Sequence, residues 1–317
     1  ELAVQVAFTG NLRLIEPAVM PKGPDPRRTG LIVALAIIAG LGSAIGIATI
    51  FEFLDDTIRD ERQLKEFDFK SLGSVAKYRL EPNLLRAKGK SQGIMLESYN
   101  ILGTNLMHVV KNSNVTSLVV TSANMREGKS TVLANLATAM AQSGKRTMIV
   151  DCDLRRPSVH RQFDMENRNG LTQIVLDDKQ GLGSYLIPGP VKKLRILLSG
   201  GIPTNPQELL MSPRFVALIR SLEKETDLLF LDSPPLLASS DAGILGSITH
   251  GVLLIVDTER TQTRELQRAV DSLNLAKANV LGCVLNKSRD IYEDLGFWHK
   301  DGVGGEAELE KLSRPYS

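Results

Sequence analysis

The sequence predicts an α/β domain built on a doubly wound parallel sheet and preceded by one transmembrane helix. Short apolar runs recur beyond residue 115 and alternate with stretches of helical periodicity, as in a parallel sheet covered on both faces. A loop of small and polar residues that ends in Gly128, Lys129 and Ser130 joins the first run to a helical stretch. An uncharged run over 29–51 precedes both features.

The uncharged run comes first in the chain and predicts a membrane span. It has 23 residues between Arg28 and Glu52, and a helix of that length is about 34 Å long, enough to cross a bilayer. A buried core helix would be shorter, and a signal peptide has a shorter apolar region. Gly42 and Gly46 form a Gly-x-x-x-Gly motif. This motif fits two interpretations equally well, a face at which two membrane helices pair, or small residues without a special role in one membrane helix.

The segments on either side of the span set the expected organisation. Pro17, Pro21, Pro24 and Pro26 predict a stiff, extended lead into the membrane. Because Glu1 is not an initiator methionine, we expect the chain to be the C-terminal part of a longer protein. The expected parts are an extracytoplasmic end and proline-rich lead (1–28), the transmembrane helix (29–54), a juxtamembrane linker (55–92), the nucleotide-binding domain (93–287) and a C-terminal tail (288–317).

The apolar runs of the domain give the expected strands, which are 118–121, 147–150, 194–198, 228–231, 252–256 and 280–285. Polar residues follow several of them: Asp151, Asp153, Asp232, Asp257 and Asn286. In open parallel sheets the ligand lies outside the carboxyl ends of the strands, so these side chains are expected to converge there.

The loop over 123–131 predicts binding of a nucleoside triphosphate. Its backbone N–H groups can turn inward around phosphate oxygens at a helix N-terminus, Lys129 can reach the β and γ phosphates, and the Ser130 hydroxyl can meet Mg²⁺. The residues expected at the nucleotide are Ala123, Arg126, Glu127, Gly128, Lys129, Ser130 and Thr131.

Three carboxylates complete the expected site. Asp151 and Asp153 stand at alternate positions past one strand, and Asp232 follows another strand in the sequence Asp-Ser-Pro-Pro. Two acids beside a triphosphate provide what Mg²⁺ and a proton acceptor require. The residues alone leave open which aspartate is the base.

Composition excludes some other classes of function. The net charge of +2 and the lack of a basic stripe interleaved with aromatics argue against nucleic acid as a partner. Cys152 and Cys283 each fall in or beside an expected strand, where a buried thiol in a reducing cytosol is the ordinary role. Because ATP and Mg²⁺ are cytosolic, the residues after the span are expected inside the cell and residues 1–28 outside.

This combination resembles the bacterial tyrosine kinases, the cytosolic part of polysaccharide co-polymerases, or chain-length determinant proteins, of capsule and exopolysaccharide synthesis. That family follows its phosphate loop with an Asp-x-Asp-x-Arg motif and a strand ending in Asp-x-Pro-Pro, and both are present here. The similarity extends to the Asn-Pro-x-Glu-Leu-Leu stretch over 205–210 and to Asn286, which matches the adenine-contacting position. Upstream, residues 11–18 and the span look like the end of a chain-length-determinant domain and its second transmembrane helix.

The resemblance implies a protein-tyrosine autokinase of the inner membrane that uses ATP and Mg²⁺. It places Lys129 on the phosphates, Asp151 as candidate base and Arg155 as a charge partner, with Ser130, Asp153 and Asp232 near the metal. The partners it implies are other copies of the chain, the polysaccharide polymerase and export machinery, and a phosphatase.

The sequence departs from the family pattern in two places, and the second of them favours an alternative, an ATP-gated assembly module with little kinase activity. The family's ring-forming Glu-x-x-Arg-x-x-Arg helix has Asn100 and Gly103 after Glu97 here, so we expect self-association through the membrane and the outer domain instead. After residue 285 the family's tyrosine cluster is reduced to Tyr292 and Tyr316, the candidate phosphoacceptors. A soluble metabolic ATPase is a third interpretation, against which the membrane span argues.

Overall fold

The computed structural model describes residues 29–54, 56–67, 69–77, 83–86, 90–113, 115–177 and 181–288. The chain forms two compact units, Glu1–Asp55 and Asp56–Ser317. The first unit contains the apolar segment and the second contains the whole sheet. The lead over 1–28 and the tail with Tyr292 and Tyr316 lie outside the described residues.

The predicted transmembrane segment forms α1, Thr29–Leu54. In the described part of the chain, it is the one helix that is long and apolar enough to cross a membrane, and none of its span is buried within the protein. The Ser43 and Thr49 hydroxyls donate to the carbonyl oxygens of Ala39 and Ile45 on the same helix, both at 2.7 Å. These polar groups are therefore satisfied without water, as an apolar environment requires.

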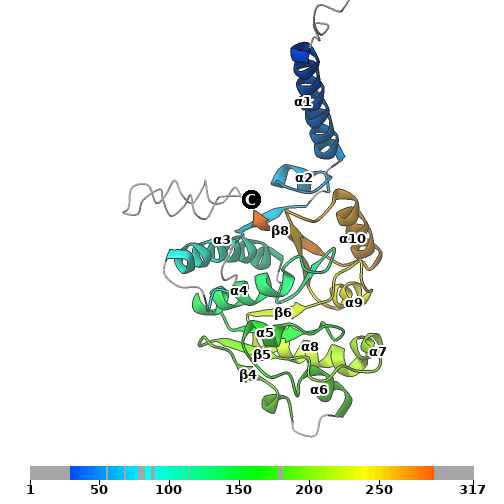
Figure 1. Ribbon diagram of the computed structural model, residues 1–317. Helices are drawn as coiled ribbons and strands as arrows, with labels where there is room; N and C mark the ends of the chain where they lie inside the picture. The colour runs from blue at the N-terminus through cyan, green and yellow to red at the C-terminus, as the bar shows by residue number, and fades with distance from the viewer. Residues whose placement is uncertain are drawn as a thin grey trace, which may run out of the picture. The chain divides into compact units, whose positions relative to one another are not determined.

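The second unit is built on an eight-stranded sheet in the order β1-β8-β7-β2-β6-β3-β5-β4. Figure 1 labels β8, β6, β5 and β4, which follow one another in this order from top to bottom of the sheet. All neighbours pair in parallel except β4 and β5. The strands are β1 (Ser71–Ala76), β2 (Ser117–Ser122), β3 (Thr147–Asp151), β4 (Ile187–Pro188), β5 (Leu194–Leu197), β6 (Leu228–Asp232), β7 (Gly251–Asp257) and β8 (Val280–Ser288). All six predicted strands are confirmed, with ends shifted by up to three residues.

Helices cover both faces of the sheet and bury two separate apolar clusters. Val119 of β2 belongs to one cluster with Phe215 and Leu266, whereas its neighbours Leu118 and Val120 belong to the other. This alternation confirms the doubly wound α/β prediction. The helices are α2 (Glu61–Lys65), α3 (Lys90–Ser113), α4 (Lys129–Gln142), α5 (Val159–Gln162), α6 (Leu171–Asp177), α7 (Pro206–Met211), α8 (Pro213–Glu225), α9 (Asp241–Ile248) and α10 (Thr263–Leu275), with a 3₁₀ turn η1 (Leu182–Ser184).

The described parts of the segment expected as a linker, 55–92, belong to the folded domain, unlike the prediction. Strand β1 pairs in parallel with β8 and extends the sheet. The Ile58 N–H donates to the Thr261 carbonyl at 2.9 Å. Leu84 is buried, and its N–H donates to the Asn135 side-chain oxygen at 2.9 Å. Gly73 and two serines leave β1 without the apolar run that identified the other strands. The two-residue strand β4 was too short to predict.

Helices α3 and α4 pack closely at Gly103. A Cβ atom there would lie 2.0 Å from Cε and 3.0 Å from Sδ of Met140, so the bare backbone of Gly103 permits the approach. Gly103→Arg, which restores the family's residue, requires the flexible end of the Met140 side chain to move, so it should lower the free energy of unfolding by about 1 kcal/mol, the low end for overpacking. Thermal denaturation measures the effect.

Gly93 provides the matched control, because it lies on the same helix and a Cβ there meets nothing within 4 Å. Gly93→Arg should leave the melting temperature nearly unchanged. Combining Gly103→Arg with Met140→Ala should recover part of the loss. Equal melting temperatures for Gly103→Arg and the wild type would show that the α3 and α4 contact adapts freely.

Candidate nucleotide site

The loop between β2 and α4 ends in an uncapped helix N-terminus. Gly128 is the N-cap of α4 with φ of 88°, and no side chain caps the helix. Its carbonyl accepts from the Val132 N–H at 2.9 Å, which begins the helical hydrogen-bond pattern. The first N–H groups of a 14-residue helix thus face the loop, and the positive end of the helix dipole favours an anion there.

A lysine, a serine and two of the carboxylates named from the sequence lie together at this helix end. The Lys129 Nζ lies 3.1 Å from Asp153 Oδ2, 3.4 Å from Asp232 Oδ1 and 3.2 Å from Ser130 Oγ. The Ser130 hydroxyl donates to Asp232 Oδ2 at 2.6 Å, and all four side chains are buried. Burial alone would lower the pKa of Lys129, but Asp232 and Asp153 outweigh it and raise that pKa. The lysine therefore stays charged.

Asp151 lies directly beside this cluster, opposite Asp232 on the adjacent strand β6. Its Oδ2 accepts the N–H groups of Ser158 and Val159 at 3.2 and 3.1 Å, and its Oδ1 accepts the Asp153 N–H at 3.3 Å. Burial, reinforced by the nearby Asp232, raises the pKa of Asp151 well above its usual range. Asp151 is thus a buried, basic carboxylate that also fixes the loop after β3.

Arg155, predicted as a catalytic charge partner, points to a different acid. Its Nε and Nη2 donate to Oδ2 and Oδ1 of Asp241 at 2.7 and 3.1 Å, a bidentate pair. Asp241 is fully buried in the first turn of α9. In this structure Arg155 therefore links the loop after β3 to α9, and its hydrogen bonds to Asp241, with the charges of Asp241 and Asp153, raise the pKa of its guanidinium.

Glu127 and Asn286, both predicted at the nucleotide, make hydrogen bonds that hold the backbone of the phosphate loop in place. The Thr261 hydroxyl donates to Glu127 Oε1 at 2.6 Å, and the Asn124 N–H donates to Oε2 at 2.9 Å. Burial raises the pKa of Glu127. The Asn286 Nδ2 donates to the Glu127 carbonyl at 2.8 Å, so its amide nitrogen is engaged by the loop backbone. Sequence reasoning missed Thr261, because no motif marks it.

Removing the Glu127 carboxylate should loosen the phosphate loop. Glu127→Ala leaves the part-buried Asn124 N–H and the buried Thr261 hydroxyl without this acceptor, which should cost about 1–3 kcal/mol of folding free energy and weaken ATP binding. Calorimetric titration with ATP and thermal denaturation measure both effects. Glu225→Ala, at an exposed glutamate in a surface ion pair, is the control. An unchanged ATP affinity in Glu127→Ala would contradict this role.

The donor set fits Mg²⁺ bound together with a nucleotide. A serine hydroxyl and the carboxylates of Asp153 and Asp232 are oxygen donors of the kind that Mg²⁺ prefers. Within the described residues, no group of three or more His, Cys, Asp or Glu side chains is arranged to hold a metal by itself. This agrees with the usual site, in which one or two carboxylates act with substrate phosphates and water.

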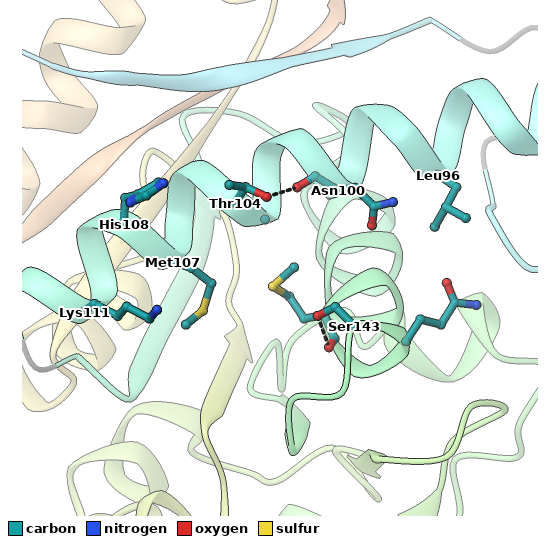
Figure 2. A pocket seen from close by; sticks show the side chains of 10 residues that line it. Leu96, Asn100, Thr104, Met107, His108, Lys111 and Ser143 are labelled. Atoms are coloured by element: carbon teal, nitrogen blue, oxygen red, sulfur yellow. Dashed lines mark hydrogen bonds between the residues drawn. The ribbon is translucent and has the colours of Figure 1, made fainter.

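A cavity of about 480 Å³ lies elsewhere, between α3 and the end of α4 (Figure 2). Its lining includes Asn100, Gly103, Lys111 and Met140. Asn100 and Gly103 are the positions at which the resemblance expects arginines. The cavity contains none of the residues predicted at the nucleotide, so it is separate from the phosphate-loop cluster.

Comparison with known proteins gives consistent results. Residues 114–300, more than half of the chain, match the family model described as "ParA: NUBPL iron-transfer P-loop NTPase". The tyrosine-protein kinase YwqD of Bacillus subtilis (strain 168) is 34% identical over 221 residues, which cover 69% of this chain and 92% of YwqD. The crystal structure of the chimerical protein CapA2B2 matches with a TM-score of 0.66 at 32% identity, covering 72% of this chain and 98% of that one.

A longer relative also matches the region that contains α1. The tyrosine-protein kinase wzc of Salmonella typhi is 27% identical over 320 residues, covering 94% of this chain and 44% of wzc. The chain thus spans less than half the length of that relative. The family description mentions iron transfer, but the two cysteines of this chain do not form a pair that could bind iron. Cys152, on the loop after β3, and Cys283, on β8, are both buried, and three strands separate β3 from β8.

Proposed function

This chain belongs to the ParA-type P-loop NTPases and, within them, to the bacterial tyrosine kinases, and we propose that it transfers the γ-phosphoryl group of ATP to tyrosine hydroxyls of other copies of itself. The observation that carries the proposal is the buried Lys129, held between Asp153 and Asp232 at an uncapped helix N-terminus. Phosphoryl transfer needs mainly positioning and charge neutralisation, and these groups provide both.

The side chains take the following roles in this proposal. The α4 N–H groups and Lys129 bind the phosphates, and Lys129 exchanges its carboxylate partners for phosphate oxygens when ATP enters. The tyrosine oxygen forms a bond to the γ-phosphorus while the bond to the ADP oxygen breaks. Mg²⁺, held by Ser130, Asp153 and Asp232 with the nucleotide, would supply further neutralisation of negative charge.

Asp151 is the proposed acceptor of the tyrosine proton. Its raised pKa makes its carboxylate a stronger base than an exposed aspartate. The N–H groups of Ser158 and Val159 occupy its Oδ2, so the tyrosine hydroxyl would approach Oδ1, which accepts one N–H group, that of Asp153. Asp153, whose Oδ2 is held by Lys129, would be released for the metal when the lysine moves to the phosphates.

The cellular setting is part of the same proposal. Helix α1 anchors the chain in the inner membrane, with the nucleotide-binding domain in the cytosol and the N-terminal residues outside. Its partners are other copies of the chain, polysaccharide polymerase and export proteins, and a phosphatase. Tyr292 and Tyr316 are the proposed phosphoacceptors.

A second function, an ATP-gated assembly module without effective kinase activity, is favoured by one observation. The tail beyond residue 285 has only these two tyrosines. The two functions differ in their products, because an assembly module changes oligomeric size with ATP and ADP but forms no phosphotyrosine.

The test incubates the full chain in detergent with ATP and Mg²⁺ and follows phosphotyrosine by antibody and particle size by light scattering. The proposal predicts phosphotyrosine that depends on ATP. A size change with ATP, without phosphotyrosine, would support the assembly module instead.

A further inference from the structure

Ser158, a residue outside the predicted site, contacts the Ser130 hydroxyl. It lies in the loop between β3 and α5, half-buried, and its hydroxyl donates to Ser130 Oγ at 2.7 Å. Ser130 donates its own proton to Asp232 Oδ2 at 2.6 Å and also accepts from the Lys129 Nζ at 3.2 Å. A serine hydroxyl has one proton and two acceptor lone pairs, so every position on Ser130 Oγ is in use.

When ATP enters, Ser130 Oγ loses the contact from Lys129 and keeps those with Ser158 and Asp232. Lys129 moves from Ser130 to the phosphates and leaves one lone pair of Ser130 Oγ open. The bonds to Ser158 and Asp232 do not depend on Lys129, and together they fix the direction of the open lone pair. Ser130 Oγ can then bind a cation next to the nucleotide through that lone pair.

We propose that Ser158 is a positioning residue of this site, whose hydroxyl holds the Ser130 hydroxyl in the orientation that ligates a divalent cation. The inference rests on the proposed function and adds to it a residue that controls how the cation supports nucleotide binding. It requires that the Ser158 hydroxyl act on Ser130 and not on the fold of its own loop.

The structure separates these two roles. The backbone, not the hydroxyl, anchors the loop, because the N–H groups of Ser158 and Val159 both donate to Asp151 Oδ2. The Arg156 N–H also donates to Asp153 Oδ1 at 2.9 Å. Ser158→Ala keeps all three bonds and removes only the contact to Ser130.

The experiment measures binding of a fluorescent ATP analogue to the full chain, with excess Mg²⁺ and with EDTA. The ratio of the two affinities is the readout, and it needs no phosphoryl transfer. In Ser158→Ala the Mg²⁺-dependent gain in affinity should fall about three- to tenfold, the range expected for one lost hydrogen bond, while binding in EDTA stays within about twofold of wild type. Ser158→Thr keeps a hydroxyl and should retain the gain.

Ser247→Ala, at an exposed serine of α9, is the control and should match the wild type. An unchanged Mg²⁺ gain in Ser158→Ala would overturn the inference. Equal losses with Mg²⁺ and EDTA would also overturn it, since they would indicate a structural role. Because binding is measured, a wild-type chain that binds ATP with a normal Mg²⁺ gain yet forms no phosphotyrosine would refute the kinase proposal and leave this inference standing.

Discussion

Lys129→Met should reduce phosphoryl transfer by at least about 100-fold, the loss typical of removing one preorganised charge-stabilising group. In the wild type Lys129 is a buried cation that faces Asp153 and Asp232. Methionine has a similar length but no charge, so the phosphates lose their buried cationic partner. Phosphotyrosine formation, measured with labelled ATP and the full chain, should become undetectable.

The matched control is Lys192→Met, at an exposed lysine that no ion pair among the described residues includes. It should keep wild-type activity. Thermal denaturation of Lys129→Met must accompany the assay, because this variant leaves two buried carboxylates without their cation. Wild-type phosphorylation in a folded Lys129→Met protein would refute the assignment of the phosphate site.

Asp151→Asn should reduce transfer by about 10²–10⁴-fold while leaving ATP binding within a few-fold of wild type. The amide cannot take the tyrosine proton, but its oxygen can still accept backbone N–H groups of the loop. The loss should therefore appear in kcat and not in the affinity for ATP. Rapid-quench kinetics, together with calorimetric titration of ATP, separates the two quantities.

Asp271→Asn, at an exposed aspartate of α10, is the control for this change. If Asp151→Asn lowers ATP binding and transfer by the same factor, its carboxylate serves only to hold the loop. The base would then have to be another group, and Asp153 is the nearest carboxylate on the same loop.

The sequence predicted the fold well where strands are buried on both faces. The runs at 148–150 and 252–256 are continuous apolar stretches, since helices cover them on both sides. Strand β1 has the sequence Ser-Leu-Gly-Ser-Val-Ala at the edge of the sheet and pairs only with β8. Its Gly and Ser residues do not form an apolar run, so only the pairing with a distant part of the chain identifies it.

In the site, too, local sequence patterns predicted some features, and contacts between distant parts of the chain determine the others. Asp232 lies at the phosphate loop because the carboxyl ends of parallel strands share one edge of the sheet, and the sequence predicted this convergence. The sequence did not predict the hydrogen bonds from Lys129 and Ser130 to Asp232. The Asn286 contact to the Glu127 carbonyl and the Arg155 pair with Asp241 join residues that are far apart in the chain. Such partners depend on the tertiary arrangement of loops, which no local pattern encodes.

The most direct test of the kinase assignment compares the ATP consumed with the phosphotyrosine formed by the full chain in detergent. Phosphopeptide mapping by mass spectrometry then locates the phosphate. Phosphate on Tyr292 or Tyr316 should accumulate with ATP and Mg²⁺ and should be lost in Lys129→Met. ATP hydrolysis without phosphate on any tyrosine would contradict the kinase assignment.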